Sequence, residues 1–251
     1  MAVQKYSPRV YRRRRINFLL LLIFLFTVTA LFYFIHSGFF GFKHLVITGN
    51  RHIEAKEVEN LMAVSKGTNL WQLDTSNIEK RLKTHPLIAD VKINRRWPNT
   101  LTVNVKERNP KAIIFNQGNF FLVDGEGVIM QRVEKVGKIN LPLITGLDKL
   151  KDIGPGSLVN DERLKVALNV VKQISSEDLN QIREIIATSP NSLQFIWAGN
   201  IIIKYGDENE VANKMAKIHK ALNGLNGTEN VEYIDVSFEG PPVIKFSQSS
   251  N

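Results

Sequence analysis

The side chains that most often carry out catalysis occur singly along this sequence. The histidines are scattered, at His36, His44, His52, His85 and His219. The H-E-x-x-H pattern of zinc proteases, the G-x-S-x-G pattern of serine hydrolases and the phosphate-binding P-loop do not occur. The chain has no cysteine, which excludes a disulfide framework and thiolate metal sites. We therefore predict no catalytic residues, no metal site and no cofactor.

Two acidic side chains beside glycines raise the question of calcium. Asp124 and Glu126 alternate with Gly125 and Gly127. Their spacing does not match the ligand positions of an EF-hand loop. Because apolar, β-rich segments lie on both sides, we predict a hairpin turn here.

One segment predicts a membrane anchor. Residues 16–35 carry no charge, and about twenty residues at 1.5 Å each span the hydrocarbon core of a bilayer. We expect a transmembrane helix over residues 16–36. A cleaved signal peptide is the alternative, but its apolar region is shorter and ends in small residues, whereas this one ends in Leu31-Phe-Tyr-Phe-Ile35.

The charges beside this segment predict its orientation. Arg12, Arg13, Arg14 and Arg15 precede it directly, and the first charge after it is Lys43. Positive flanks stay in the cytoplasm, so we expect residues 1–15 inside and the chain from Lys43 onward outside. The basic tail, with Lys5 and Arg9, supplies six of the nine net positive charges. The outer part is only mildly basic, which removes the reason to predict nucleic acid as a partner.

After a short linker, residues 37–41, the periodicity predicts a small domain of strand, helix, helix, strand, strand. We expect strands where apolar and polar residues alternate and helices where apolar residues recur at helical spacing. Asp74 or Thr75 is expected to cap the second helix, and His85-Pro86 to end it. The expected elements are strand 42–48, helix 55–63, a helix from residue 75, and strands 89–93 and 101–105.

The remainder, residues 110–246, is predicted to be mainly β, with flanking helices. Expected strands cover 112–116, 120–123, 128–132, 185–188, 193–197, 201–205, 231–238 and 243–246. Helices are expected at 164–174, at 176–184 and at 211–222, where Val211, Met215, Ile218 and Leu222 share one face. Trp97 is expected to pack beside its hairpin. Residues 247–251 form a polar tail.

Several motifs in this order resemble the FtsQ/DivIB family of bacterial cell-division proteins, whose first outer domain is a POTRA domain. They are Phe42-x-x-x-x-Ile47-x-Gly49-Asn50, Gly67-Thr-Asn-Leu70, His85-Pro86-Leu-Ile88, Arg95-Arg96-Trp97-Pro98-Asn-Thr-Leu101, Val105-Lys-Glu107-Arg108-x-Pro110 and Phe121-Leu-Val123-Asp124-x-x-Gly127. The resemblance covers the whole chain. One departure is Ile53-Glu54, where relatives often carry a Ser or Thr helix cap.

The resemblance implies an α+β fold: one transmembrane helix, a POTRA-like βααββ domain at 42–109 and a β-rich domain at 110–246. It also implies a non-enzymatic, single-pass type II protein of the cytoplasmic membrane that supports septum formation. Its expected partners are FtsB/DivIC-like and FtsL-like single-pass proteins, with no small-molecule substrate. The implied partner-binding residues are Tyr233, Phe238, Val243, Ile244, Lys245 and Phe246. The turn Pro241-Pro242 departs from many relatives.

Two other functions stay open at this stage. A membrane-anchored cell-wall enzyme would need a catalytic group assembled from residues distant in sequence. A POTRA-type secretion or assembly factor would usually carry several POTRA repeats and a membrane barrel, and this chain shows one such unit and no run of barrel strands.

Overall fold

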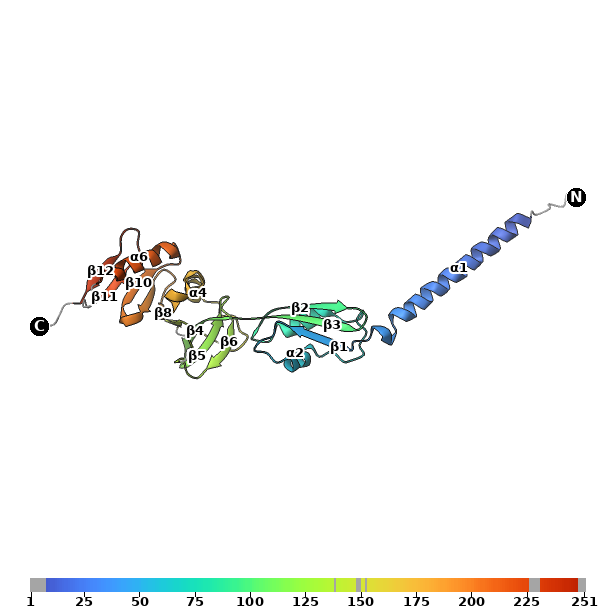
Figure 1. Ribbon diagram of the computed structural model, residues 1–251, viewed down its shortest axis with the longest axis horizontal. Helices are drawn as coiled ribbons and strands as arrows, with labels where there is room; N and C mark the ends of the chain where they lie inside the picture. Colours follow the sequence, from blue (N-terminus) through green and yellow to red (C-terminus); the bar gives the residue numbers. More distant parts are fainter. Residues whose placement is uncertain (1–7, 138, 148–149, 152, 226–230, 248–251) are drawn as a thin grey trace. The chain divides into compact units, whose positions relative to one another are not determined.

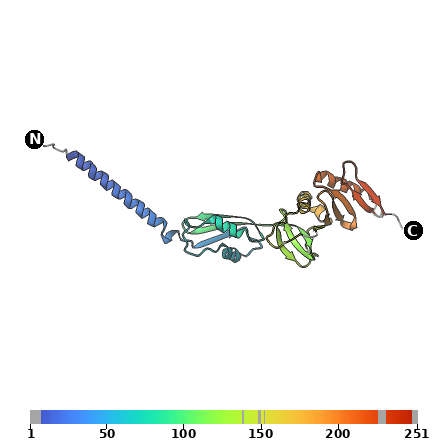
Figure 2. The same cartoon turned by 180° about the vertical axis from the view of Figure 1, so that it is seen from behind.

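The computed structural model describes residues 8–137, 139–147, 150–151, 153–225 and 231–247 (Figures 1 and 2). The chain forms two compact units. The first contains residues 1–83 and 90–106, and the second contains residues 84–89 and 107–251. The predicted polar tail, apart from Ser247, lies outside the described residues, as does the start of the basic tail.

The first unit begins with a long helix, α1 (Pro8–Ile35). It starts eight residues before the predicted span, because proline is tolerated in a first helical turn and arginine favours helix. Among the described residues, the one segment long and apolar enough to cross a membrane is residues 15–40, most of which lie in this helix, and its apolar stretch has a mean hydropathy of 2.7. The hydroxyls of Thr27 and Thr29 donate to the carbonyls of Ile23 and Leu25, each at 2.8 Å. These two hydroxyls are therefore satisfied within the helix.

The short helix η1 (Gly38–Phe40) leads into a βααββ unit, as predicted. Its elements are β1 (His44–Thr48), α2 (Ala55–Met62), α3 (Thr75–Leu82), β2 (Ile88–Arg96) and β3 (Thr100–Glu107). The sheet order is β1-β3-β2, with β1 parallel to β3. Leu101, Val103 and Val105 of β3 are buried and alternate with more exposed residues, so one face of the sheet meets the core.

A side-chain cap marks the start of α3 but not the start of α2. The Asp74 carboxylate accepts a hydrogen bond from the Asn77 backbone N–H at 3.0 Å, which confirms it as the cap of α3. Glu54 precedes α2 without a side-chain cap, as its residue type predicted. The apolar faces of both helices are buried, through Val58 and Met62 in α2 and through Ile78 and Leu82 in α3.

The second unit contains a nine-stranded sheet in the order β12-β11-β10-β9-β8-β7-β4-β5-β6. Its main core holds residues of α4, α6 and the sheet, with Phe195 and Tyr205 stacked at 4.4 Å between ring centroids. The strands are β4 (Pro110–Asn116), β5 (Asn119–Asp124), β6 (Ile129–Val133), β7 (Leu143–Thr145), β8 (Ile182–Ala187), β9 (Leu193–Trp197), β10 (Ile202–Gly206), β11 (Val231–Asp235) and β12 (Val243–Phe246). The helices are α4 (Glu162–Gln173), α5 (Ser176–Leu179), η2 (Ala198–Asn200) and α6 (Val211–Asn223).

Three details differ from the sequence predictions. The helix predicted at 176–184 is wrong beyond Leu179, because Ile182 and Ile185 are buried in β8, paired between β7 and β9. The strand predicted to reach Phe238 ends at Asp235, whose carboxylate accepts hydrogen bonds from the backbone N–H and hydroxyl of Ser237 at 3.0 and 2.6 Å. Such a turn removes the backbone from the ladder. Strand β7 was not predicted, since it has three residues.

Candidate partner-binding edge of the large sheet

The nine-stranded sheet has two edge strands, β6 and β12 (Figure 1). An edge strand presents backbone N–H and C=O groups that can pair with another strand. The surroundings of these two edges therefore decide where the sheet can accept a partner.

The start of the β6 edge is covered by the chain itself. The segment 156–159 runs along its outer side as an irregular partner. The Gly156 N–H donates to the Ile129 carbonyl at 2.8 Å, and the Ile129 N–H donates to the Ser157 carbonyl at 2.9 Å. The Val159 N–H donates to the Gly127 carbonyl at 2.9 Å. These bonds use backbone groups that an incoming strand would need.

The turn between β5 and β6 is held by Asp124, which is 5% exposed. One carboxylate oxygen accepts from the backbone N–H groups of Glu126 and Val128, both at 2.9 Å. The other accepts from Arg108 at 2.6 Å. This confirms the hairpin turn, in which the Asp124 carboxylate is engaged by two backbone N–H groups and by Arg108.

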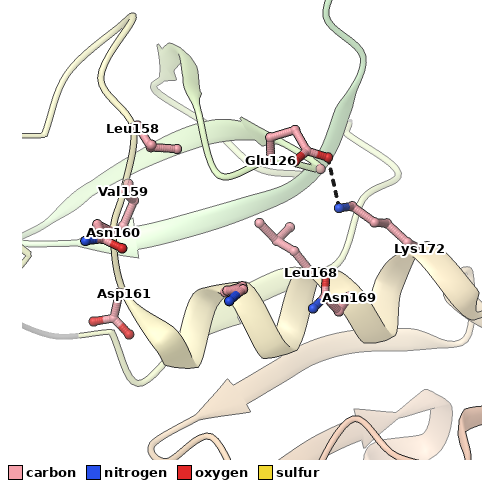
Figure 3. A pocket seen from close by; sticks show the side chains of 10 residues that line it. Glu126, Leu158, Val159, Asn160, Asp161, Leu168, Asn169 and Lys172 are labelled. Carbon is pink, nitrogen blue, oxygen red and sulfur yellow. Dashed lines mark hydrogen bonds and ion pairs between the residues drawn. The ribbon is translucent and has the colours of Figure 1, made fainter.

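A shallow pocket lies beside this turn, between the β5–β6 hairpin and α4 (Figure 3). Its volume is about 280 Å³. Glu126 at its rim pairs with Lys172 at 3.0 Å. Within the described part of the chain, no three His, Asp or Glu side chains lie close enough together to hold a metal ion.

The β12 edge is open on its outer side in the described part of the chain. β12 pairs with β11 in antiparallel register, with Val243 opposite Asp235, Ile244 opposite Ile234 and Lys245 opposite Tyr233. No other described strand adjoins it. The strand is therefore free to pair along its second side.

The predicted residues at this edge divide into two groups. Phe238, Val243 and Phe246 are exposed at 44%, 47% and 48%. Phe238 lies in the turn after β11, and not in a strand as predicted. Ile244 is partly buried against the main core, where it anchors β12 to the unit. In the described part of the second unit, the only other large apolar side chain that is exposed is Leu158.

Tyr233 lies beneath two cations on the outer face of β11. The Lys204 ammonium is 3.6 Å from the centre of its ring, and that of Lys245 is 5.5 Å away. Lys245 also pairs with Glu232 at 2.9 Å, and this carboxylate raises the pKa of Lys245. Neither Lys204 nor Glu232 was predicted from the sequence as part of this edge. Alternation within residues 201–205 puts Lys204 opposite the core face, but the parallel pairing of β10 with β11 had no sequence signal.

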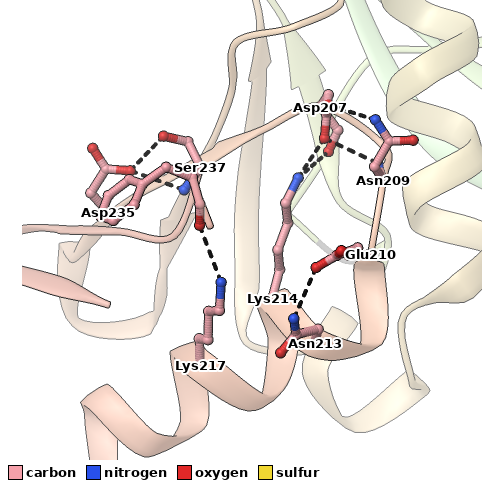
Figure 4. A network of polar contacts seen from close by, with 9 residues as sticks. Asp207, Asn209, Glu210, Asn213, Lys214, Lys217, Asp235 and Ser237 are labelled. Carbon is pink, nitrogen blue, oxygen red and sulfur yellow. Dashed lines mark hydrogen bonds and ion pairs between the residues drawn. The ribbon is translucent and has the colours of Figure 1, made fainter. Parts of the chain in front are cut away.

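Lysines of α6 hold the turn that leads to β12 (Figure 4). Lys217 donates to the Phe238 carbonyl at 3.1 Å. Lys214, which is 6% exposed, donates to the Asp207 carboxylate at 2.6 Å and to its carbonyl at 3.0 Å. The bond from Lys214, followed by those from Asn209, lowers the pKa of Asp207. These contacts fix the ends of β10 and β11 relative to α6.

The four arginines of the predicted topology signal lie in α1. Arg12, Arg13 and Arg14 fall within its first turns, and Arg15 is exposed. The side to which they direct the helix stays a prediction.

An apolar helix of membrane-spanning length, followed by a βααββ unit and a β-rich unit with an open edge, defines a class: membrane-anchored proteins with a POTRA-type domain. Comparison with known families agrees. Residues 40–108 match the FtsQ-type POTRA domain, and residues 112–237 match the C-terminal domain of the cell division proteins FtsQ/DivIB. The chain therefore belongs to the FtsQ/DivIB family of cell division proteins.

Individual relatives agree with this assignment. The chain is 26% identical to the cell division protein DivIB of Clostridium acetobutylicum, over 84% of each chain. It is 25% identical to FtsQ of Syntrophotalea carbinolica, over 83% of this chain and 75% of that protein. The solved major extracytoplasmic domain of DivIB from Geobacillus stearothermophilus matches 49% of this chain and 98% of its own, with 12% identity and a TM-score of 0.35. That score is too low to support an argument.

Proposed function

We propose that this division protein is a non-enzymatic scaffold that binds a second membrane-anchored division protein through the open edge of β12. The partner proposed is of the FtsB/DivIC type, associated with an FtsL-type protein. The first step is β-augmentation: a segment of the partner adds a strand beside β12, and backbone hydrogen bonds supply affinity.

The contrast between the two sheet edges is the observation that carries this proposal. Hydrogen bonds from residues 156–159 cover the start of β6 at Ile129, whereas β12 has a described strand on one side only. Natural proteins usually protect a sheet edge, because an open one pairs with other chains. The uncovered edge at β12 is therefore a good candidate for a binding surface.

The side chains at this edge supply a means of selection. Phe238, Val243 and Phe246 can fill apolar pockets of a partner, since binding energy concentrates in a few buried anchors. Lys245 and Lys204, on the face that carries Tyr233, favour an acidic group in the incoming strand. Charge would then align the partner while the backbone bonds hold it.

The anchor strengthens a modest contact. In the proposed topology, residues 12–15 keep the N-terminus in the cytoplasm, and both outer units lie beyond the membrane. A partner anchored in the same bilayer is held at a high effective concentration. We place this complex at the division septum, where the family acts.

Truncation tests the proposal. The full chain is compared with a chain that stops after Gly240, each co-expressed with its own FtsB/DivIC-type and FtsL-type proteins and purified in mild detergent. We expect loss of co-purification, because the shortened chain lacks β12. Protease resistance of residues 42–109 serves as the control for folding of the first unit. Undiminished co-purification would overturn the edge-strand mechanism.

A further inference from the structure

Five aromatic side chains gather where α1 meets the first folded elements: Phe34, Phe39, Phe40, Trp71 and Trp97, here called the aromatic cluster. Phe34 of α1 stacks on Phe39 with 5.6 Å between ring centroids and meets Phe40 at 5.3 Å. Phe40 contacts both indoles, at 6.2 and 5.7 Å, and the indoles lie 4.3 Å apart. The cluster therefore continues from the apolar helix to the βααββ elements without a break.

The aromatic cluster faces solvent in the isolated chain. Phe39 is 55% exposed, Trp71 is 54% exposed and Trp97 is 43% exposed. Outside α1, the described part of the first unit has one other exposed large apolar side chain, Val46. Large exposed indoles in one patch usually mark an interaction surface, because the exposure of a contiguous apolar area to water is unfavourable. Trp97 thus packs on Trp71 and stays partly exposed instead of being buried in a core.

Hydrogen bonds fasten this patch to the end of the apolar helix. Asn69 is 9% exposed, and its side-chain amide donates to the Ile35 carbonyl at 2.8 Å. The side-chain oxygen of Asn69 accepts from the backbone N–H of Trp71 at 3.0 Å. The Leu70 N–H donates to the Phe40 carbonyl at 2.9 Å, and Arg95 donates to the Leu70 carbonyl at 2.7 Å. The loop that carries Trp71 is therefore held beside the last turn of α1.

The position and chemistry of the aromatic cluster indicate what it contacts. If residues 16–35 fill the hydrocarbon core, the rings directly beyond Ile35 reach the depth of the lipid headgroups. Tryptophan is enriched at that depth, because its ring is apolar and its N–H remains hydrated. Exposed Lys43 and Arg96 adjoin the cluster in sequence and can meet anionic headgroups.

We infer that the aromatic cluster inserts into the headgroup region of the bilayer that α1 spans, and so holds the POTRA-type unit at the membrane surface. The occupant is lipid, since the patch is continuous with the span and borders basic residues. This placement rests on the proposed membrane anchoring but not on the mechanism proposed for β12. It assigns a role to Trp71 and Trp97 that partner capture does not require.

Tryptophan fluorescence tests the placement, because the chain has three tryptophans and the third, Trp197, is buried in the second unit. Three variants of the full chain each keep one indole and replace the other two with phenylalanine. They are reconstituted in vesicles of three parts phosphatidylcholine to one part phosphatidylglycerol, with bromine placed high or low on the acyl chains. We expect several-fold stronger quenching of Trp71 and Trp97 than of Trp197, greatest with the shallow bromines.

Flotation of the vesicles separates the two levels of the proposal. Quenching of Trp71 and Trp97 no greater than that of Trp197, in protein that floats with the vesicles, overturns the aromatic-cluster placement alone. Protein that does not float overturns the anchoring as well.

A nitroxide label provides a second measurement that keeps both indoles. The chain has no cysteine, so Gln72→Cys beside Trp71 and Asn104→Cys farther along β3 each give one labelling site. Both positions are exposed. We expect the label at position 72 to be several-fold more accessible to oxygen, relative to a water-soluble nickel chelate, than the label at position 104. Equal accessibility at the two positions contradicts the placement.

Discussion

Strands β6 and β12 form the two ends of the same sheet, but they differ in what lies along their outer sides. β6 has Ile129 and Met130 buried, and residues 156–157 bond to both backbone groups of Ile129 at its start. β12 has three of its four residues exposed and pairs with β11 alone among the described strands. The difference teaches that this unit can close an edge within its own sequence, so the open edge at β12 is not a necessary consequence of the fold.

The two edges also differ in the side chains that support them. At β6, the buried pair of Arg108 and Asp124 fixes the hairpin. At β12, the ion pair of Lys245 and Glu232 is exposed, and the apolar residues Val243 and Phe246 face water. We therefore expect mutations at β6 to change stability and mutations at β12 to change binding.

The largest expected effect is on capture at β12. Val243→Glu with Phe246→Glu replaces two exposed apolar anchors by charges, while Ile244 continues to hold the strand to the core. At about 2 kcal/mol for each anchor, the dissociation constant of the partner should rise roughly 1000-fold. Binding of the purified FtsB/DivIC-type protein to the full chain in nanodiscs measures it. An unchanged constant would show that the open edge is not the binding surface.

The next effect is on stability at β6. Asp124→Asn leaves the Arg108 guanidinium facing an amide in a site where both side chains are largely buried. We expect the free energy of unfolding to fall by about 3 kcal/mol, because one member of a buried ion pair loses its partner. Denaturant unfolding of the full chain in detergent gives the value. Glu126→Gln, at an exposed ion pair, should cost less than about 1 kcal/mol. Loss of partner binding in a folded Asp124→Asn chain would contradict the expectation that changes at β6 affect stability and not binding.

A smaller effect is expected from Lys245→Met. This change removes the exposed cation beside Tyr233, and we expect partner affinity to fall a few-fold with little change in stability. Since Glu232 raises the pKa of Lys245 above its ordinary value of 10.5, the ion pair is present below that pH and is lost as pH rises through the raised pKa. The Lys245 contribution to affinity should therefore stay constant between about pH 6 and pH 9. Among side chains with unperturbed pKa values, histidine is the one that titrates in this range. A titration of binding in that range that disappears in the Met variant would contradict this.

The smallest effect is expected from Leu158→Glu. Leu158 is the most exposed large apolar residue of the second unit among those described, and it lies in the segment that closes β6. Because its side chain faces water, we expect the free energy of unfolding to change by less than about 0.5 kcal/mol and binding to stay unchanged. Thermal unfolding and the nanodisc assay both apply. A loss of binding here would move the interface to the β6 side.

The sequence predicted which segments form helices and strands better than it predicted which strands pair with one another. Alternation identified β2 and β3, and Asp74 predicted the start of α3. The order of the sheet was not predictable, because the three-residue β7 lies between β4 and β8 and joins segments far apart in the chain. The bonds that residues 156–159 make at the start of β6 had no periodic pattern in the sequence to predict them.

The candidate sites show the same limit. Phe238, Val243 and Phe246 were proposed from the family resemblance, whereas Lys204 was missed because its contact with Tyr233 depends on parallel pairing. Trp97 was expected to pack beside its own hairpin, and its stacking on Trp71 depends on how a distant loop is held. Local pattern predicts which face a residue occupies, and tertiary pairing decides what it meets.

Crosslinking in living cells tests the central claim most directly. A photo-reactive residue is placed at Lys245 on β12 or at Arg132 on β6, both of which are exposed. We predict that position 245 captures a single-pass division protein of the FtsB/DivIC type and that position 132 does not. Capture from position 132 with none from position 245, or equal capture from both, would contradict the open-edge account.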